Sequence, residues 1–359
     1  MGSTCVRCSQ AVDPPSRGAL CVACGARLRA LLAARPGVRR AVERPLVWPF
    51  GAAALIALAT VIAILRQFST GAMEEISTQH GEWHVLGGAQ FISPVGMAAD
   101  HLGNLYVIDA ANYRIDKLGP DGNLVATFGA RGTAPGQFDR PTAVALDPIG
   151  NLYVADTASS RIQKLSSTGV PLASWGSFGT APGEFNGPHG LTVDHEGNVY
   201  VSDTGNDRLQ KLSPLGRVMA VWGRSGQAPG EFRQPFGVAL DADGAMYVAD
   251  NLNHRVQKLS ASGTPMAEWG TYGFGVGQFN YPRWVVVDIR GDVFVSDSYN
   301  HRIQQLSPMG TPRAIWGSRG GQPGQFRRPE GLVVDEAGGM VVVDADNDRL
   351  QRYVPSPTP

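Results

Sequence analysis

Residues 232–270 read FRQPFGVALDADGAMYVADNLNHRVQKLSASGTPMAEWG, and they contain four short runs with strand character, at 237–241, 245–250, 255–260 and 265–270. The turns between these runs are D-A-D-G, D-N-L-N-H and S-A-S-G-T. Glycine at a fixed place in two of the turns suits a hairpin that needs a positive φ. The stretch therefore predicts one unit of four antiparallel strands.

The unit recurs six times at a spacing of 47 residues, without insertion or deletion. The repeated positions include Phe91, Phe138, Phe185, Phe232, Phe279 and Phe326; Asp109, Asp156, Asp203, Asp250, Asp297 and Asp344; and Arg114, Arg161, Arg208, Arg255, Arg302 and Arg349. A period in this range is typical of a solenoid or a propeller. Four strands per repeat favour the blade of a β-propeller.

The two ends of the repeated region predict a closed ring. The sixth unit supplies only three strands, and the segment 82–87 (EWHVLG), which precedes the first unit, resembles an outer strand. Pairing of this segment with the last blade would remove the free edges of the ring. Aromatic residues recur on the outer strand and on the second strand, where we expect them to pack between blades.

The pattern F-x-x-P-x-G-V-x-x-D, followed by N-x-Y-V-x-D and N-x-R-I-Q-K-L, resembles the NHL repeat and covers about three-quarters of the chain. The resemblance implies an all-β, six-bladed NHL-type propeller over residues 81–354, with a proline-rich tail at 355–359. Proteins of this family serve as binding platforms in membrane receptors and kinases, as RNA or protein binders, and as the scaffold of a few lyases.

All four cysteines lie in the first 24 residues, as Cys5, Cys8, Cys21 and Cys24. Two C-x2-C turns place four thiolates around one metal, which suits a tetrahedral, structural Zn²⁺ site. Residues 1–26 thus resemble a zinc ribbon, and the alternative is two disulfides or a redox pair. A basic juxtamembrane segment follows at 27–45, which we interpret as a topology signal or as a contact with anionic headgroups.

Residues 46–65 (LVWPFGAAALIALATVIAIL) contain no charged side chain. Twenty residues at about 1.5 Å rise span the hydrocarbon core of a bilayer, so the segment predicts one transmembrane helix rather than a buried core helix. Eight arginines precede it and one follows before Arg114, which predicts a cytoplasmic N-terminus and an extracytoplasmic propeller after a linker at 66–80. A cleaved signal peptide is the competing interpretation.

The charge balance argues against nucleic acid as a partner. The chain has 31 basic and 31 acidic residues; residues 1–79 hold nine and four of them, which leaves 22 and 27 for the propeller. A phosphate-binding face needs clustered positive charge. We expect the six Asp–Arg pairs to be structural, each fastening one turn, because a single ligand would not need six copies.

Function is better sought where the repeats differ. The residue after the repeated proline is Val95, Thr142, His189, Phe236, Arg283 or Glu330, and we expect these side chains to ring the mouth of the channel. The glycine that follows becomes Trp284 in the fifth unit. The neighbouring turn contributes Leu252 and Tyr299.

Aromatic residues beside arginine are the usual anchors of a binding surface. The sequence therefore predicts a patch across units four and five, made of Phe236, Leu252, Arg283, Trp284 and Tyr299, with His189 and Glu330 at the same mouth; repeat drift without a ligand is the alternative. The predicted function is a membrane-anchored binding protein whose propeller takes a protein, peptide or glycan, with a possible relay to the zinc ribbon.

The rival hypothesis is a lyase- or hydrolase-type enzyme at the channel mouth, for which the sequence offers no histidine pair at metal-binding spacing.

Overall fold

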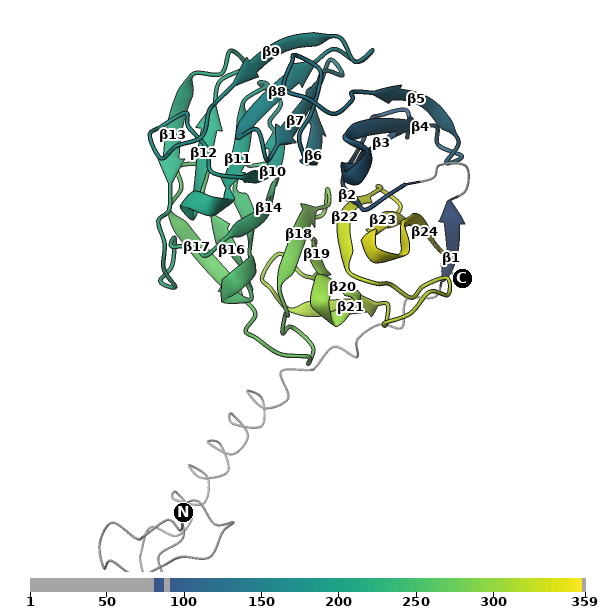
Figure 1. The fold of residues 1–359 in the computed structure, drawn as a ribbon. Helices are drawn as coiled ribbons and strands as arrows, with labels where there is room; N and C mark the ends of the chain where they lie inside the picture. The colour runs from purple at the N-terminus through teal and green to yellow at the C-terminus, as the bar shows by residue number, and fades with distance from the viewer. Residues whose placement is uncertain (1–80, 87–90, 357–359) are drawn as a thin grey trace, which may run out of the picture. The chain divides into compact units, whose positions relative to one another are not determined.

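Each 47-residue repeat folds into one four-stranded antiparallel sheet, and six such sheets surround a common axis (Figure 1). The computed structural model describes residues 81–86 and 91–356. The predicted all-β, six-bladed propeller is therefore confirmed. The predicted segments 1–26, 27–45, 46–65 and 66–80 lie outside the described residues.

The strands run from the axis outward in chain order, except in blade 6. Blade 1 holds β2 (Pro94–Ala99), β3 (Leu105–Asp109), β4 (Arg114–Leu118) and β5 (Leu124–Phe128), and blade 2 holds β6 (Pro141–Leu146), β7 (Leu152–Asp156), β8 (Arg161–Leu165) and β9 (Pro171–Trp175). Blade 3 holds β10 (Pro188–Val193), β11 (Val199–Asp203), β12 (Arg208–Leu212) and β13 (Val218–Trp222), and blade 4 holds β14 (Pro235–Leu240), β15 (Met246–Asp250), β16 (Arg255–Leu259) and β17 (Pro265–Trp269). Blade 5 holds β18 (Pro282–Val287), β19 (Val293–Asp297), β20 (Arg302–Leu306) and β21 (Pro312–Trp316), and blade 6 holds β22 (Pro329–Val334), β23 (Met340–Asp344), β24 (Arg349–Pro355) and β1 (Gly81–Leu86).

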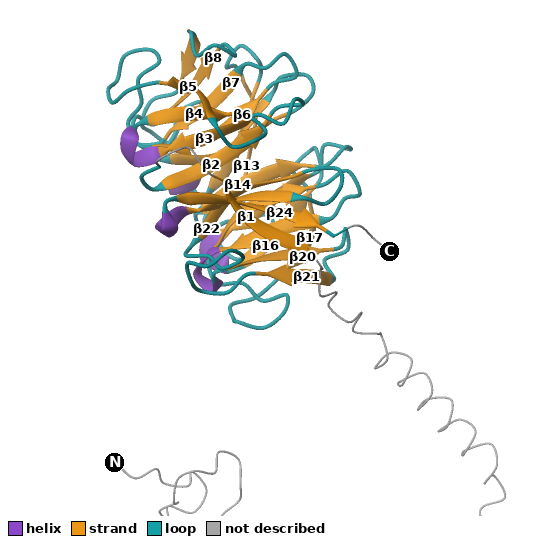
Figure 2. Ribbon diagram, turned by 90° about the vertical axis from the view of Figure 1, so that its right-hand side faces the viewer, coloured by secondary structure: helices purple, strands orange, loops and turns teal. Residues whose placement is uncertain are grey.

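Because neighbouring strands are antiparallel, the turns fall on two opposite faces. One face holds the turns between second and third strands together with the loops that join blades, and we call it the upper face. Five of these turns are short 3-10 helices, η1 (Ala110–Asn112), η2 (Thr204–Asn206), η3 (Asn251–Asn253), η4 (Ser298–Asn300) and η5 (Ala345–Asn347), which gather on one side of the ring in Figure 2. The remaining turns form the lower face.

The ring closes through β1, as the sequence predicts. β1 pairs with β24 from Gly81 opposite Pro355 to Leu86 opposite Leu350, so strands from the two ends of the repeated region complete blade 6. Trp83 of β1 packs against Phe326 and Tyr353, with ring centroids 5.1 and 5.2 Å apart. The free edge of β24 is thereby covered.

A buried carboxylate organises the upper end of each blade. In blade 5, Asp297 is fully buried and its Oδ1 accepts the backbone N–H of Asn280 at 2.7 Å. Its Oδ2 accepts Nε of Arg302 (2.7 Å), Nδ2 of Asn300 (2.8 Å) and Nε2 of Gln304 (3.0 Å). The other five repeats hold the same Asp–Arg ion pair at 2.7–3.0 Å. This confirms that the pairs are structural.

Two histidines have an equally structural role. Nδ1 of His254 accepts the backbone N–H of Tyr281 in the next blade, and Nδ1 of His301 accepts that of Arg328, both at 3.1 Å. Asp207 and Asp348 occupy the equivalent positions and accept the same backbone donor at 2.7 Å. Both histidines therefore link neighbouring blades through a hydrogen bond.

The hydrophobic core lies between neighbouring blades. One cluster joins Tyr106 and Ile108 of blade 1 to Val144 and Leu152 of blade 2. The outer-strand aromatics pack on the turn of the next blade, as Trp222 does when its Nε1–H donates to the carbonyl of Ser262 at 2.9 Å. Inter-blade packing by these aromatics is thus confirmed.

No helix within residues 81–86 and 91–356 is long and apolar enough to cross a membrane.

We predict that Trp83→Ala lowers the free energy of unfolding by about 3 kcal/mol, because the indole fills the seam that closes the ring. The matched control on the same strand is Val85→Ala, which removes a side chain that is 45% exposed and should cost about 0.5 kcal/mol or less. Urea unfolding followed by tryptophan fluorescence and circular dichroism measures both. Equal effects of the two variants would show that β1 does not hold the ring closed.

Candidate functional site

The residue after the repeated proline is the second residue of each inner strand, at its upper end. The structure brings four of these side chains together at the mouth of the channel, His189, Phe236, Arg283 and Glu330, from blades 3 to 6 in succession. The rings of His189 and Phe236 lie 4.0 Å apart, and the guanidinium carbon of Arg283 lies 4.9 Å from the Phe236 ring. Arg283 Nη1 donates to Glu330 Oε1 at 2.8 Å. We call these four residues the mouth cluster.

Tyr299 borders the mouth cluster from η4. Its ring lies 6.0 Å from the guanidinium carbon of Arg283, and 48% of the residue is exposed. Leu252 lies in η3, is partly exposed, and its backbone N–H donates to the carbonyl of Arg233 at 3.1 Å. Tyr299 therefore extends the mouth cluster outward.

Trp284 lies elsewhere than the sequence suggests. Instead of presenting its ring on the surface, it is 6% exposed and belongs to the hydrophobic core with Ala143. A Cβ built on Gly96 would lie 3.1 Å from Cη2 of Trp284, and one on Gly237 would lie 2.9 Å from its Cα. Inner strands approach so closely here that glycine is needed in most blades, and the indole fills the space that these glycines leave. Trp284 is thus a packing residue beneath the mouth cluster.

Arg328 also belongs to the site, although it precedes the repeated proline whereas the residues of the mouth cluster follow it. Its Nη1 donates to Glu330 Oε1 at 2.5 Å, and its Nε and Nη2 donate to Asp346 Oδ1 at 2.8 and 2.6 Å. Glu330 therefore accepts from two arginines through one oxygen. In the sequence, the only sign of this residue is that an arginine immediately precedes the repeated proline of the sixth unit. In the structure Arg328 has a φ of 51°.

The mouth cluster contains buried polar atoms without a hydrogen-bond partner. They are Nδ1 of His189, Nε of Arg283 and Oε2 of Glu330. Leaving such an atom unpaired is costly, and most buried polar groups find a partner in protein or water. The three atoms come from three different blades: Nε of Arg283 is a donor, Oε2 of Glu330 is an acceptor, and Nδ1 of the neutral His189 can be either. A polar ligand that displaced the side chains covering these atoms would supply partners for them.

Burial shifts the ionisation of two of these groups in opposite directions. Burial raises the pKa of Glu330, and the neighbouring Arg283 and Arg328 oppose this rise. Burial, together with repulsion from Arg283, Arg140 and Arg328, lowers the pKa of His189 to about 3. The imidazole of His189 is therefore neutral at pH 7.

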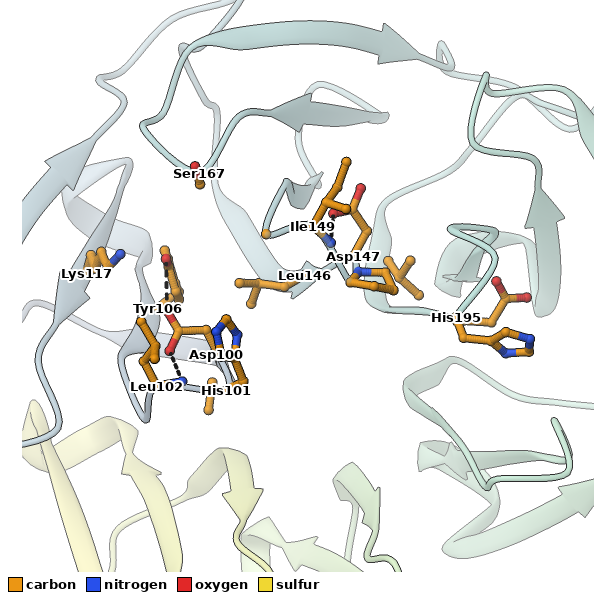
Figure 3. Close-up of a pocket in the computed structure, with 15 residues that line it drawn as sticks. Asp100, His101, Leu102, Tyr106, Lys117, Leu146, Asp147, Ile149, Ser167 and His195 are labelled. Carbon is orange, nitrogen blue, oxygen red and sulfur yellow. Dashed lines mark hydrogen bonds between the residues drawn. The ribbon is translucent and has the colours of Figure 1, made fainter.

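A separate cavity of about 620 Å³ opens on the lower face, between blades 1, 2 and 3 (Figure 3). Its carboxylates repeat in each blade and are already engaged: Asp147 accepts the backbone and side-chain N–H groups of Asn151, both at 2.8 Å. Burial raises the pKa of Asp147, but these bonds and Lys164 hold it below its ordinary value. His101 and His195 lie well apart at the rim in Figure 3. Among the described residues no three His, Cys, Asp or Glu side chains are placed to hold a metal.

We predict that acid destabilises the propeller through His189. The unfolded chain binds a proton near pH 6.5, whereas the folded chain does so only near pH 3. Stability should therefore fall as the pH drops below 6.5, by at most about 1.4 kcal/mol per pH unit. His189→Phe, which copies Phe236 of the next blade, should flatten this dependence between pH 6.5 and 5. Parallel pH profiles of the melting temperature in the two proteins would contradict the assignment.

Comparison with known proteins supports the repeat and the fold. The model of a family described as NHL repeat matches residues 138–165, 185–212, 232–259 and 279–306, which lie in blades 2 to 5. No curated protein matches the chain.

Several solved structures share the architecture at low identity. A streptogramin B lyase is 16% identical, with a TM-score of 0.55, and the match covers 77% of this chain and 98% of that one. A gluconolactonase from Xanthomonas campestris is 14% identical, with a TM-score of 0.58 and coverage of 80% and 94%. An auxiliary nutrient binding protein from Bacteroides thetaiotaomicron is 13% identical, with a TM-score of 0.59 and coverage of 77% of each chain. At these identities the likeness concerns the fold alone, and we conclude that the described chain is a six-bladed β-propeller in which blades 2 to 5 contain NHL repeats.

Proposed function

We propose that this protein is a binding protein whose propeller takes up a protein, peptide or glycan ligand on its upper face. One observation carries the proposal: three neighbouring residues of the mouth cluster, His189, Arg283 and Glu330, each hold a buried polar atom without a hydrogen-bond partner. These positions differ in every repeat, so the symmetry of the fold does not require them. A ligand that donates to Glu330 and accepts from Arg283 would restore the missing hydrogen bonds.

We favour binding over catalysis because the mouth lacks the usual partner of a catalytic histidine. A histidine that acts as a base is normally oriented by a second group, often a carboxylate. The charged groups that act on His189 are the three arginines Arg283, Arg140 and Arg328. Its ring packs against Phe236. The streptogramin lyase and gluconolactonase neighbours keep an enzymatic role as the alternative function.

We further propose that the protein is anchored in a membrane by residues 46–65, with a cytoplasmic N-terminus and an extracytoplasmic propeller. The support is the uncharged stretch of hydrocarbon-spanning length and the arginines that precede it. Cys5, Cys8, Cys21 and Cys24 would hold one structural zinc ion, which suits a reducing compartment. These residues lie outside the part that the structure describes.

We predict that Arg283→Lys weakens ligand binding at the mouth by about tenfold or more. Lysine keeps a positive charge for Glu330 but has no equivalent of the unpaired Nε, and a hydrogen bond to a charged group is worth about 1.5–3 kcal/mol. Defined oligosaccharides and short peptides are screened for those that raise the melting temperature of the protein, and calorimetry then measures their Kd.

The matched control is Arg290→Lys, in the same blade but on the lower face, where the arginine side chain is 56% exposed. It should bind every probe as the wild type does. A probe whose Kd is the same for both variants and the wild type would place the ligand away from the mouth.

We predict that protease added to spheroplasts digests the propeller and leaves a protected N-terminal fragment that retains about one zinc ion. Cys5→Ser with Cys8→Ser should abolish the zinc without altering the protection. Metal analysis of the purified fragment and mass spectrometry of its ends measure both properties. An intact propeller after digestion would refute the topology, and a metal-free wild-type fragment would refute the zinc site.

A further inference from the structure

A line of aromatic side chains leads across the upper face from the rim to the mouth cluster. From the outside inward it consists of Phe274, Tyr272, His254, Tyr281 and Tyr299, and we call it the aromatic row. Successive ring centroids are 6.0, 4.9, 4.6 and 5.0 Å apart. Tyr299 then approaches Arg283 at 6.0 Å, which joins the aromatic row to the mouth cluster.

The aromatic row is specific to the junction of blades 4 and 5. At the repeat positions of Tyr272 the other loops hold Arg131, Phe178, Ser225 and Arg319, and at those of Phe274 they hold Thr133, Thr180, Gln227 and Gly321. The other junctions between blades are built without equivalents of Tyr272 and Phe274 together, so the propeller fold does not need these two rings. Phe274 and Tyr272 are 68% and 58% exposed, which is more than packing would leave.

The aromatic row is also the uncharged part of the upper face. The loop 270–281 contains no Asp, Glu, Lys or Arg, whereas the loops 129–140, 176–187, 223–234 and 317–328 each contain at least one. The loop therefore offers a partner no charged side chain to pair with, which favours a neutral ligand. Such a ligand must also offer apolar faces to the rings and polar groups to the three tyrosine hydroxyls.

Hydroxyl groups fit the inner end of the row as well. Each hydroxyl both donates and accepts a hydrogen bond, which matches the unpaired acceptor Oε2 of Glu330 and the unpaired donor Nε of Arg283. A peptide bound by strand addition would need an unpaired strand edge. The row is made instead of loop and 3-10 residues, and the inner strands beside it are paired with their neighbours.

From this geometry we propose that the aromatic row binds a neutral oligosaccharide, whose terminal sugar enters the mouth cluster. The proposal rests on the proposed function and names the ligand class of that site. Sugar rings present C–H faces to the aromatic planes, and their hydroxyls meet the tyrosines. The row adds affinity for each further sugar beyond the first.

The test uses residues 73–359, which form one compact unit whose ring is closed by β1. An array of neutral oligosaccharides of increasing length, acidic oligosaccharides and proline-rich peptides is probed, and calorimetry gives the Kd of each hit. Tyr272→Ser with Phe274→Thr replaces both rings with residues that other repeats hold at the same positions. Phe178→Ser is the control, since Phe178 is an aromatic residue at the loop position of Tyr272 in another junction and is 75% exposed.

We expect affinity to rise with oligosaccharide length in the wild type. The double variant should lose at least tenfold for long oligosaccharides and nothing for the monosaccharide, whereas Arg283→Lys should weaken both. The Phe178→Ser variant should match the wild type. Equal Kd values of wild type and double variant at every length, or binding of peptides alone, would overturn the aromatic row as a glycan site while the mouth remained a binding site. Binding by none of the probes would overturn both.

Discussion

The structure depends on one buried carboxylate per blade. Asp297 and its five equivalents accept hydrogen bonds from a backbone N–H in the incoming loop and from an arginine of the same blade, so each carboxylate ties the loop to its blade. Burial raises the pKa of Asp297, and its hydrogen bonds work against that rise. A buried charge is tolerable only when such partners surround it. The D-x4-R spacing is thus a requirement of the turn.

Once the carboxylates fix the turns, the residues between them are free to vary. The position after the repeated proline faces the mouth and makes no contact that every blade needs, so it can hold His189, Phe236, Arg283 or Glu330 in successive blades. The next position is constrained, because the inner strands meet there with little room for a Cβ. Adjacent residues on one strand therefore face the mouth and pack against neighbouring inner strands respectively.

This difference explains what the sequence could predict. The strands, the closure by β1 and the structural Asp–Arg pairs follow from spacing and turn chemistry, which act locally and repeat six times. The contacts of His189 with Phe236 and of Arg283 with Glu330 follow from the shared repeat position. The burial of Trp284 does not, because it depends on glycines in other blades that leave room at the axis. The lower cavity and the role of Arg328 likewise arise from side-chain packing across blades, which has no periodic signature.

The upper and lower faces of the propeller differ in how their residues depart from the repeat pattern. On the lower face the turns vary at exposed tips, while the repeated carboxylates keep partners in their own blade, as Asp147 does with Asn151, Tyr153 and Lys164. On the upper face the variation reaches buried polar atoms and leaves several of them unpaired. β1 begins at Gly81, opposite Pro355 at the lower end of β24. β1 therefore starts at the lower end of blade 6 and runs toward the upper face, antiparallel to β24.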